Sequence, residues 1–290
     1  MALFFRIINN KLISAGDTPR LGFSKSDPYY IPDEYLNQQE FTVFRTAWGI
    51  GDWGIISAIP RLLKQKYPNC KVYVPSAKLV KNLFNLDTNI MYDIFQNNPY
   101  VDEFKDKIEG EIFHDHYRIY NTKNLNIPLT EQMLKFWQFS ENEYKDSQPE
   151  IYWSDKEKEL GDRIIEKYIG EREFGSLLIS ERFGTQFGKY DKVSYDNDNK
   201  KIIKLLNNNK LPYFYWTHKP LNQFNFDFIE NILDMHNMDL RLQLYIKSRA
   251  KINIGNQCGT NHCIARYSNV HEIQRQSILG HNFVKGETYY

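Results

Sequence analysis

From residue 41 onward, apolar and polar residues alternate in blocks that predict strands and helices in turn. Phe41–Ala47 is rich in aromatic and β-branched residues and predicts a strand, and apolar positions from Ile55 to Tyr67 recur at helical spacing. Pro60 lies within this helical pattern and should kink the helix or limit its first segment. Further strands are predicted at 71–74, 90–95 and 111–120, and helices at 77–84 and 129–139. Such alternation indicates βαβ units on a parallel sheet.

The alternation restarts after the charged stretch 140–150, which we interpret as a linker. Beyond it, helices are predicted at 154–169, 200–206, 226–233, 242–249 and 259–267, and strands at 176–180, 213–217 and 251–254. Residues 1–40 form an atypical extension, in which Asn9-Asn10 between Phe4–Ile8 and Leu12–Ser14 indicates a hairpin. We therefore predict an α/β protein of two domains, 1–150 and 151–290.

Composition narrows the classes of function without selecting one. Of the 290 residues, 41% are hydrophobic and 25% charged, as in ordinary soluble globular proteins, and the net charge of +1 gives no bias toward nucleic acid. Three cysteines are too few for a disulfide framework and favour a reducing compartment. No apolar run approaches the roughly 18 residues of a membrane span. We expect a cytoplasmic protein, with peripheral membrane contact left open.

A glycine-rich turn follows the first strand of the alternating region. Gly49, Gly51 and Gly54 satisfy GxGxxG, a pattern that favours phosphate at a helix N-terminus. A dinucleotide-binding fold also needs an acid about 20 residues later, and the second strand ends without one at Val74–Ala77. NAD(P) binding is therefore the weaker interpretation. Asp52 within this turn is either a general base for a hydroxyl nucleophile or a carboxylate that stabilises the helix start.

Two segments of the second half are candidates for anion binding. The turn Gly259–His262 follows a short strand and begins a helix, so its amides suit a phosphate, and Thr260 either caps the helix or bonds a phosphate oxygen. The loop Glu181–Lys189 offers a guanidinium, a hydroxyl and an ammonium for a diphosphate, from Arg182, Thr185 and Lys189. A solvated surface loop is the alternative. Both segments follow strands of one sheet, so they should open on the same edge.

Three other patterns carry weaker signals. His114 and His116 lie two positions apart on a predicted strand and therefore share one face, as paired metal ligands do, but no third ligand is evident, so no metal site is predicted. Asp196-Asn197-Asp198 has the DxD form found in metal-dependent sugar transferases, although its polar setting favours a solvated loop. Trp216–His218 ends a predicted strand, where it could meet a donor base.

Several short motifs, taken in order, resemble the heptosyltransferase-like glycosyltransferases of family nine. Gly51-Asp52 is followed by Ala58, Pro60, Leu63 and Tyr67-Pro68, as at the start of that family. Asn98–Glu103 reads NPYVDE, as the family's usual segment does. The stretch from Ser248 to Ala265 resembles the family's signature of small residue, strand, glycine, histidine and alanine, here with Gly259 and His262. The resemblance covers residues from about 41 to 270.

The resemblance implies a GT-B fold, in which two Rossmann-like domains with parallel sheets face a central cleft. It implies that Asp52 is the catalytic base, that Lys189 lies near the donor phosphates, and that 259–262 is the phosphate-binding turn. We therefore predict an inverting transferase that moves a sugar from a nucleoside-diphosphate sugar to a hydroxyl of a glycan or lipopolysaccharide-like acceptor, with no cofactor and no metal.

In this prediction the acceptor-side turn comprises Gly49, Gly51 and Trp53. The donor phosphates contact Arg182, Thr185, Lys189, Gly259, Thr260, Asn261 and His262. A non-catalytic nucleotide- or carbohydrate-binding protein on the same scaffold is the alternative, favoured by the uncharged residues of the turn Asn253–Gln257. An NAD(P)-dependent oxidoreductase is the third possibility.

Overall fold

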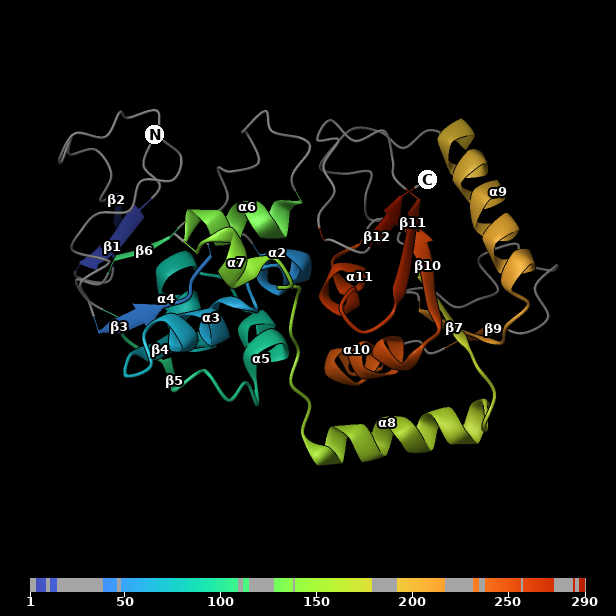
Figure 1. The fold of residues 1–290 in the computed structure, drawn as a ribbon, viewed down its shortest axis with the longest axis horizontal. Coiled ribbons are helices and arrows are strands. Elements are labelled where there is room, and N and C mark those ends of the chain that lie inside the picture. The colour runs from blue at the N-terminus through green and yellow to red at the C-terminus, as the bar shows by residue number, and fades with distance from the viewer. Residues whose placement is uncertain are drawn as a thin grey trace. The chain divides into compact units, whose positions relative to one another are not determined.

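The computed structural model forms two compact units, Met1–Tyr152 and Trp153–Tyr290 (Figure 1). It describes residues 4–8, 11–14, 39–45, 48–108, 112–114, 128–137, 139–178, 192–216, 232–234, 238–256, 258–273, 284 and 287–289. Each unit is an α/β structure built on a parallel sheet. The predicted fold class, α/β with parallel sheets, is thereby confirmed.

The N-terminal unit has a three-stranded parallel sheet in the order β3-β4-β5, formed by Glu40–Thr42, Lys71–Pro75 and Glu103–Lys105. A separate antiparallel sheet joins the predicted hairpin, β1 (Phe4–Ile8) and β2 (Lys11–Ser14), to β6 (Ile112–His114). The helices of this unit are α2 (Ile50–Gly54), α3 (Ile59–Lys66), α4 (Ala77–Phe84), α5 (Ile90–Phe95), α6 (Leu129–Phe136) and α7 (Glu141–Tyr144).

A proline and a capping serine define where α3 and α4 begin. Pro60 lies in the first turn of α3, where its missing N–H costs nothing, so it limits the helix as predicted. The Ser76 hydroxyl accepts from the Leu79 N–H at 3.1 Å and caps α4.

The strand predicted at 90–95 is wrong, because this segment is the helix α5. Its buried residues Ile90, Met91, Ile94 and Phe95 repeat every four positions, so a helical face was present within a run too short to distinguish from a strand. A third parallel strand, β5, lies instead at 103–105, where none was predicted.

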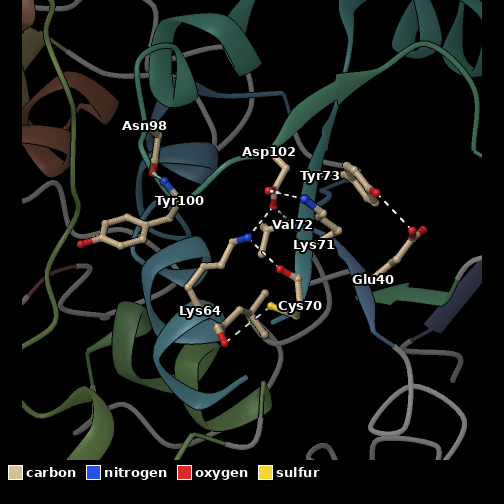
Figure 2. A network of polar contacts seen from close by, with 10 residues as sticks. Glu40, Lys64, Cys70, Lys71, Val72, Tyr73, Asn98, Tyr100 and Asp102 are labelled. Carbon is tan, nitrogen blue, oxygen red and sulfur yellow. Dashed lines mark hydrogen bonds and ion pairs between the residues drawn. The ribbon is translucent and has the colours of Figure 1, made fainter. Parts of the chain in front are cut away.

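The NPYVDE segment, Asn98–Glu103, leads from α5 into β5 and fixes β5 beside β4 (Figure 2). The Asn98 side chain accepts from the Tyr100 N–H at 2.9 Å, which closes a local turn. The Asp102 carboxylate accepts from the Val72 N–H at 2.7 Å and pairs with Lys64 at 2.6 Å. Among the described residues, the contacts of this motif therefore have a structural role: they hold β5 in the sheet.

The stretch 140–150 is not a linker, because it packs into the N-terminal unit. The Glu150 N–H donates to the Ser57 hydroxyl at 2.6 Å, and Arg61 Nε donates to the Glu150 carboxylate at 2.8 Å. Tyr144 is fully buried. Charged side chains gave the segment its linker-like composition, but tertiary pairing with Arg61 orders it.

The C-terminal unit has a six-stranded parallel sheet in the order β9-β8-β7-β10-β11-β12. The strands are β7 (Gly175–Leu178), β8 (Tyr213–Trp216), β9 (Ile232–Asp234), β10 (Ile252–Asn256), β11 (Asn269–Ile273) and β12 (Glu287–Tyr289). Counted along this unit, the order is 3-2-1-4-5-6, that of the doubly wound Rossmann sheet. The helices are α8 (Asp155–Tyr168), α9 (Lys192–Asn209), α10 (Leu240–Arg249) and α11 (Gly259–Ile264).

Both faces of this sheet are covered, as a parallel sheet requires. On one face, Ile202 and Leu206 of α9 pack on Leu177 and Ile254. On the other, Leu242 and Ile246 of α10 pack around Phe214 and Trp216, with Ile164 and Ile165 of α8 beside them. Figure 1 shows α8 and α10 together and α9 apart from them within this unit.

Glycine permits the closest contact between the two central strands. A Cβ on Gly255 would lie 2.1 Å from the Leu178 carbonyl oxygen, a backbone atom that cannot rotate away. Only glycine therefore allows β10 to approach the carboxyl end of β7 at this register.

Some predictions for the second half are corrected. Asp196–Asp198 lies in α9 rather than in a loop, because the packing of Ile202 and Leu206 overrides the polar composition. Residues 232–233 begin β9 instead of ending a helix, and the rest of that predicted helix lies outside the described residues. β11 and β12 follow the last predicted helix. None of the described helices is long and apolar enough to cross a membrane.

Tyr213→Phe tests whether the buried Tyr213 hydroxyl destabilises the core of the C-terminal unit. The Tyr213 hydroxyl is buried with no hydrogen-bond partner in the described part of the chain, and burial raises its pKa to about 12. At pH 7 we expect the variant to be as stable as the wild type, or more stable by about 1 kcal/mol.

Above pH 10 the unfolded tyrosine loses its proton while the folded one keeps it, so wild-type stability falls as pH rises toward 12. The Phe variant should lose less over this range, by on the order of 2 kcal/mol in urea unfolding. Equal loss in both proteins would contradict this account.

Candidate functional site

Asp52 lies in the short helix α2, directly after the loop that follows β3. Arg45 Nη2 donates to Asp52 Oδ1 at 3.1 Å, and the Gly49 N–H donates to Oδ2 at 3.2 Å. The Arg45 side chain is fully buried, whereas the Asp52 side chain is 25% exposed. Two fixed donors therefore orient a carboxylate that solvent can reach, as a general base requires.

The predicted acceptor-side turn anchors α2. Gly49 is the residue before the helix, in an extended conformation, and the Asp52 carboxylate folds back to accept from its N–H. Gly51 is buried, and Trp53 is fully buried with Phe44 and Phe95 edge-on at 6.3 Å. Trp53 thus holds the turn from the core side.

This arrangement weighs against a dinucleotide at the glycine turn. The N-terminus of α2 already receives a carboxylate, that of Asp52, so a pyrophosphate there would face a negative charge. A Cβ on Gly49 would meet Asp52 Oδ2 at 2.7 Å, so the glycine makes room for this side chain.

The sheet of the C-terminal unit has its topological switch point between β7 and β10. In open α/β sheets, ligands bind outside the carboxyl ends of the strands at such a point. Two predicted donor segments begin there: the loop with Arg182, Thr185 and Lys189 follows β7, and the turn at Gly259 follows β10. Arg182, Thr185 and Lys189 themselves lie outside the described residues.

At the turn after β10, the structure directs two of the predicted side chains toward an internal lysine. Lys247 Nζ, fully buried, donates to Thr260 Oγ1 at 3.0 Å and to Asn261 Oδ1 at 2.6 Å. Burial lowers the pKa of Lys247. These two side chains hold α11 against α10, so they are engaged within the protein.

The His262 side chain, predicted to contact the donor phosphates, instead lies beside two carboxylates. His262 Nδ1 lies 2.6 Å from Glu287 Oε1 and 4.0 Å from Glu272 Oε1. The Cys258 N–H also donates to Glu272 Oε1, at 3.2 Å. Burial, opposed by the attraction of His262, raises the pKa of Glu272 to about 8.

Sequence reasoning missed Arg45, Lys247, Glu272 and Glu287. Arg45 is a charge within a predicted strand, a position that usually demands a partner, so it was a usable signal. Lys247 lies near the end of a predicted helix that also carries Arg249, where a solvated lysine is the default. Glu272 and Glu287 lie beyond the last predicted helix, and only the pairing of β11 with β12 reveals their proximity.

The structure describes only some of the remaining candidate residues. His114 lies on β6, and its predicted companion His116 lies outside the described residues. Trp216 is fully buried and donates through Nε1 to the Ser176 hydroxyl at 2.9 Å, while Thr217 and His218 are not among the described residues.

Comparison with known proteins establishes the fold. No protein-family model and no curated protein matches the sequence. Among solved structures, the family 9 glycosyl transferase of Veillonella parvula aligns with a TM-score of 0.56 at 9% identity, covering 87% of this chain and 86% of that one. The Escherichia coli ADP-heptose heptosyltransferase II aligns with a TM-score of 0.49 at 10% identity, covering 86% and 90%. The chain therefore shares the α/β fold of the Veillonella glycosyltransferase over most of its length.

Lys247→Met tests whether the buried ammonium holds α11. Methionine keeps the apolar stem but leaves Thr260 and Asn261 without their donor, so we expect the free energy of unfolding to fall by about 1–3 kcal/mol. Lys251→Met is the matched control: this lysine is 52% exposed in its pair with Glu173 and should change stability by less than about 1 kcal/mol. Equal effects in urea unfolding would remove Lys247 from this role.

Proposed function

We propose that this protein is a glycosyltransferase, which moves a sugar from a nucleoside-diphosphate sugar to a hydroxyl acceptor with inversion. The observation that carries the proposal is the strand order of the C-terminal unit, whose switch point lies where the two predicted phosphate-binding segments begin. The fold shared with a family 9 glycosyl transferase supports the same class of activity.

In this mechanism the acceptor oxygen attacks the anomeric carbon of the donor as the bond from that carbon to the diphosphate oxygen breaks. The acceptor proton passes to the Asp52 carboxylate, which Arg45 and the Gly49 N–H orient. Attack opposite the leaving group inverts the anomeric centre. The diphosphate departs with its charge, so the site must supply compensating positive groups.

The donor diphosphate is assigned to the segments that follow β7 and β10. Arg182 and Lys189 provide charge, and Thr185 a hydroxyl. At the second segment the N–H groups near Gly259 are assigned to a phosphate oxygen, since the Thr260 and Asn261 side chains bind Lys247. Amides and cations suffice for this charge, so the proposed transfer step uses no metal or cofactor.

A non-catalytic nucleotide- or carbohydrate-binding protein is the second candidate. It is favoured by the internal use of Thr260, Asn261 and His262, which leaves fewer side chains for catalysis at this turn. The C-terminal unit also lacks a feature of NAD(P)-dependent oxidoreductases. These enzymes hold the ribose with an acid at the end of the second strand, whereas β8 ends at Trp216 and is followed by Thr217-His218.

Ligand-dependent thermal unfolding distinguishes these classes. UDP-, GDP-, ADP- and CMP-sugars and NAD(P) are added separately, and a bound ligand raises the melting temperature by mass action. We expect one nucleotide sugar to stabilise the protein and NAD(P) to have no effect. Stabilisation by NAD(P) alone would contradict the proposal, and a nucleotide sugar bound without turnover on any hydroxyl acceptor would select the binding protein.

Asp52→Asn tests the base. Asparagine keeps an oxygen for the Gly49 N–H but cannot take a proton, so transfer should fall by about 10²–10⁴-fold while nucleotide affinity is unchanged. Asp87→Asn, which alters an exposed pair with Lys81, is the control and should leave transfer intact. Full transfer by the Asp52 variant would exclude Asp52 as the base.

Lys189→Ala tests the donor segment independently of the base. Loss of one cation beside a diphosphate should weaken binding of the nucleoside diphosphate by about tenfold or more, measured by isothermal titration calorimetry. Lys210→Ala, a change at the residue that follows α9, is the control for charge in the same unit. Equal affinities for the wild type and the Lys189 variant would remove Lys189 from the donor site.

A further inference from the structure

Three potential metal ligands converge in the C-terminal unit from elements that are distant in the sequence. His262 lies on α11, Glu272 on β11 and Glu287 on β12, and their ligand atoms lie within 4.8 Å of one another. None of these side chains is more than 5% exposed. The cluster therefore lies away from solvent, unlike the acidic groups common on protein surfaces.

Strand register explains why the two carboxylates meet. β11 and β12 are parallel, with Val270 opposite Glu287 and Glu272 opposite Tyr289. Side chains of paired residues point to the same face, as do those two positions apart on one strand. Glu272 and Glu287 therefore lie on one face of the sheet, and His262 of α11 faces them there.

The hydrogen bonds around this cluster leave one carboxylate oxygen without a partner among the described residues. Glu272 is fully buried, and its Oε2 has no hydrogen-bond partner among the described residues. Its Oε1 accepts from the Cys258 N–H at 3.2 Å. The nearby Lys247 Nζ donates to Thr260 and Asn261. A buried carboxylate oxygen without a partner is costly, so it points to a cation that binds there.

We propose that His262, Glu272 and Glu287 bind a divalent transition-metal ion of the Zn²⁺ type. An imidazole nitrogen with two carboxylate oxygens suits such an ion better than Mg²⁺ or Ca²⁺, which prefer oxygen alone. The sequence offered only His114 and His116 as paired metal ligands; Glu272 and Glu287 follow the last predicted helix and were not among the candidates. The ion joins α11 to β11 and β12, a structural role separate from the proposed transfer step.

The spacing of the ligand atoms fits this ion after small side-chain rotations. Tetrahedral ligands at about 2.0–2.1 Å from Zn²⁺ lie roughly 3.3 Å from one another. The observed distances from His262 Nδ1, 2.6 Å to Glu287 and 4.0 Å to Glu272, lie on either side of that value. Three protein ligands leave a fourth position for water, as in many zinc sites.

Zinc titration of the full chain tests the proposal. Protein treated with EDTA and then freed of the chelator is titrated with ZnCl₂ by calorimetry, with MgCl₂ in parallel. We expect about one Zn²⁺ per chain at micromolar or tighter affinity, no measurable Mg²⁺ binding, and a higher melting temperature with Zn²⁺. Absence of stoichiometric Zn²⁺ binding would overturn the proposal and leave the cluster as an internal ion-pair network.

Two variants and one control locate the bound ion. Glu287→Gln and Glu272→Gln should each weaken Zn²⁺ binding by about tenfold or more. His271→Gln is the matched control, because it changes the residue next to Glu272 on β11, whose side chain points to the opposite face. It should change affinity by less than about twofold. Circular dichroism of each metal-free variant establishes that it is folded.

Each result for the variants has a defined consequence. Undiminished binding in both glutamate variants would place the ion elsewhere in the chain and refute the site. If Glu272→Gln fails to fold, Glu287→Gln, whose carboxylate lies at the edge strand β12, carries the test alone. Zn²⁺ binding and nucleotide binding are measured separately, so failure of the metal site leaves the proposed glycosyl transfer intact.

Discussion

The parallel pairing of β7 with β10 is the constraint on which the C-terminal unit depends. The chain passes from β7 to β8 through α9 on one face, and from β10 to β11 through α11, which contacts α10 on the other. The connections that leave these two strands therefore diverge to opposite faces. In doubly wound sheets such a divergence marks the switch point at which nucleotides bind, and Gly255 allows the two backbones to approach there.

After β10, buried polar contacts fix α11. Lys247 binds Thr260 and Asn261, and His262 meets the two glutamates of β11 and β12. These contacts fix the position of the helix relative to the sheet, although Glu272 Oε2 has no hydrogen-bond partner among the described residues. In the N-terminal unit, the buried Arg45 guanidinium likewise fixes the orientation of a polar group, the accessible Asp52 carboxylate.

Sequence patterns identified the elements with strong local signals. The hairpin at Phe4–Ser14, the helix Ala77–Phe84 and the strand at 213–216 were predicted because caps, turn residues and periodicity agreed. The helix at 90–95 was missed because a six-residue apolar run fits either period. The pairing of Glu272 with Glu287 depends on strand register, and no local pattern encodes contact between residues joined only through a sheet. The sequence singled out Asp52 as a candidate base, which stays a prediction, whereas its partner Arg45 was read as an ordinary strand residue.

Hydrogen–deuterium exchange with a bound nucleoside diphosphate tests the central claim, that the nucleotide binds at the carboxyl ends of β7 and β10. Protection should appear in peptides that contain Leu177–Leu178 and Gly255–His262, and in the segment that follows β7. Protection confined to the glycine turn of the N-terminal unit, Gly49–Gly54, with the ends of β7 and β10 unchanged, would contradict the account.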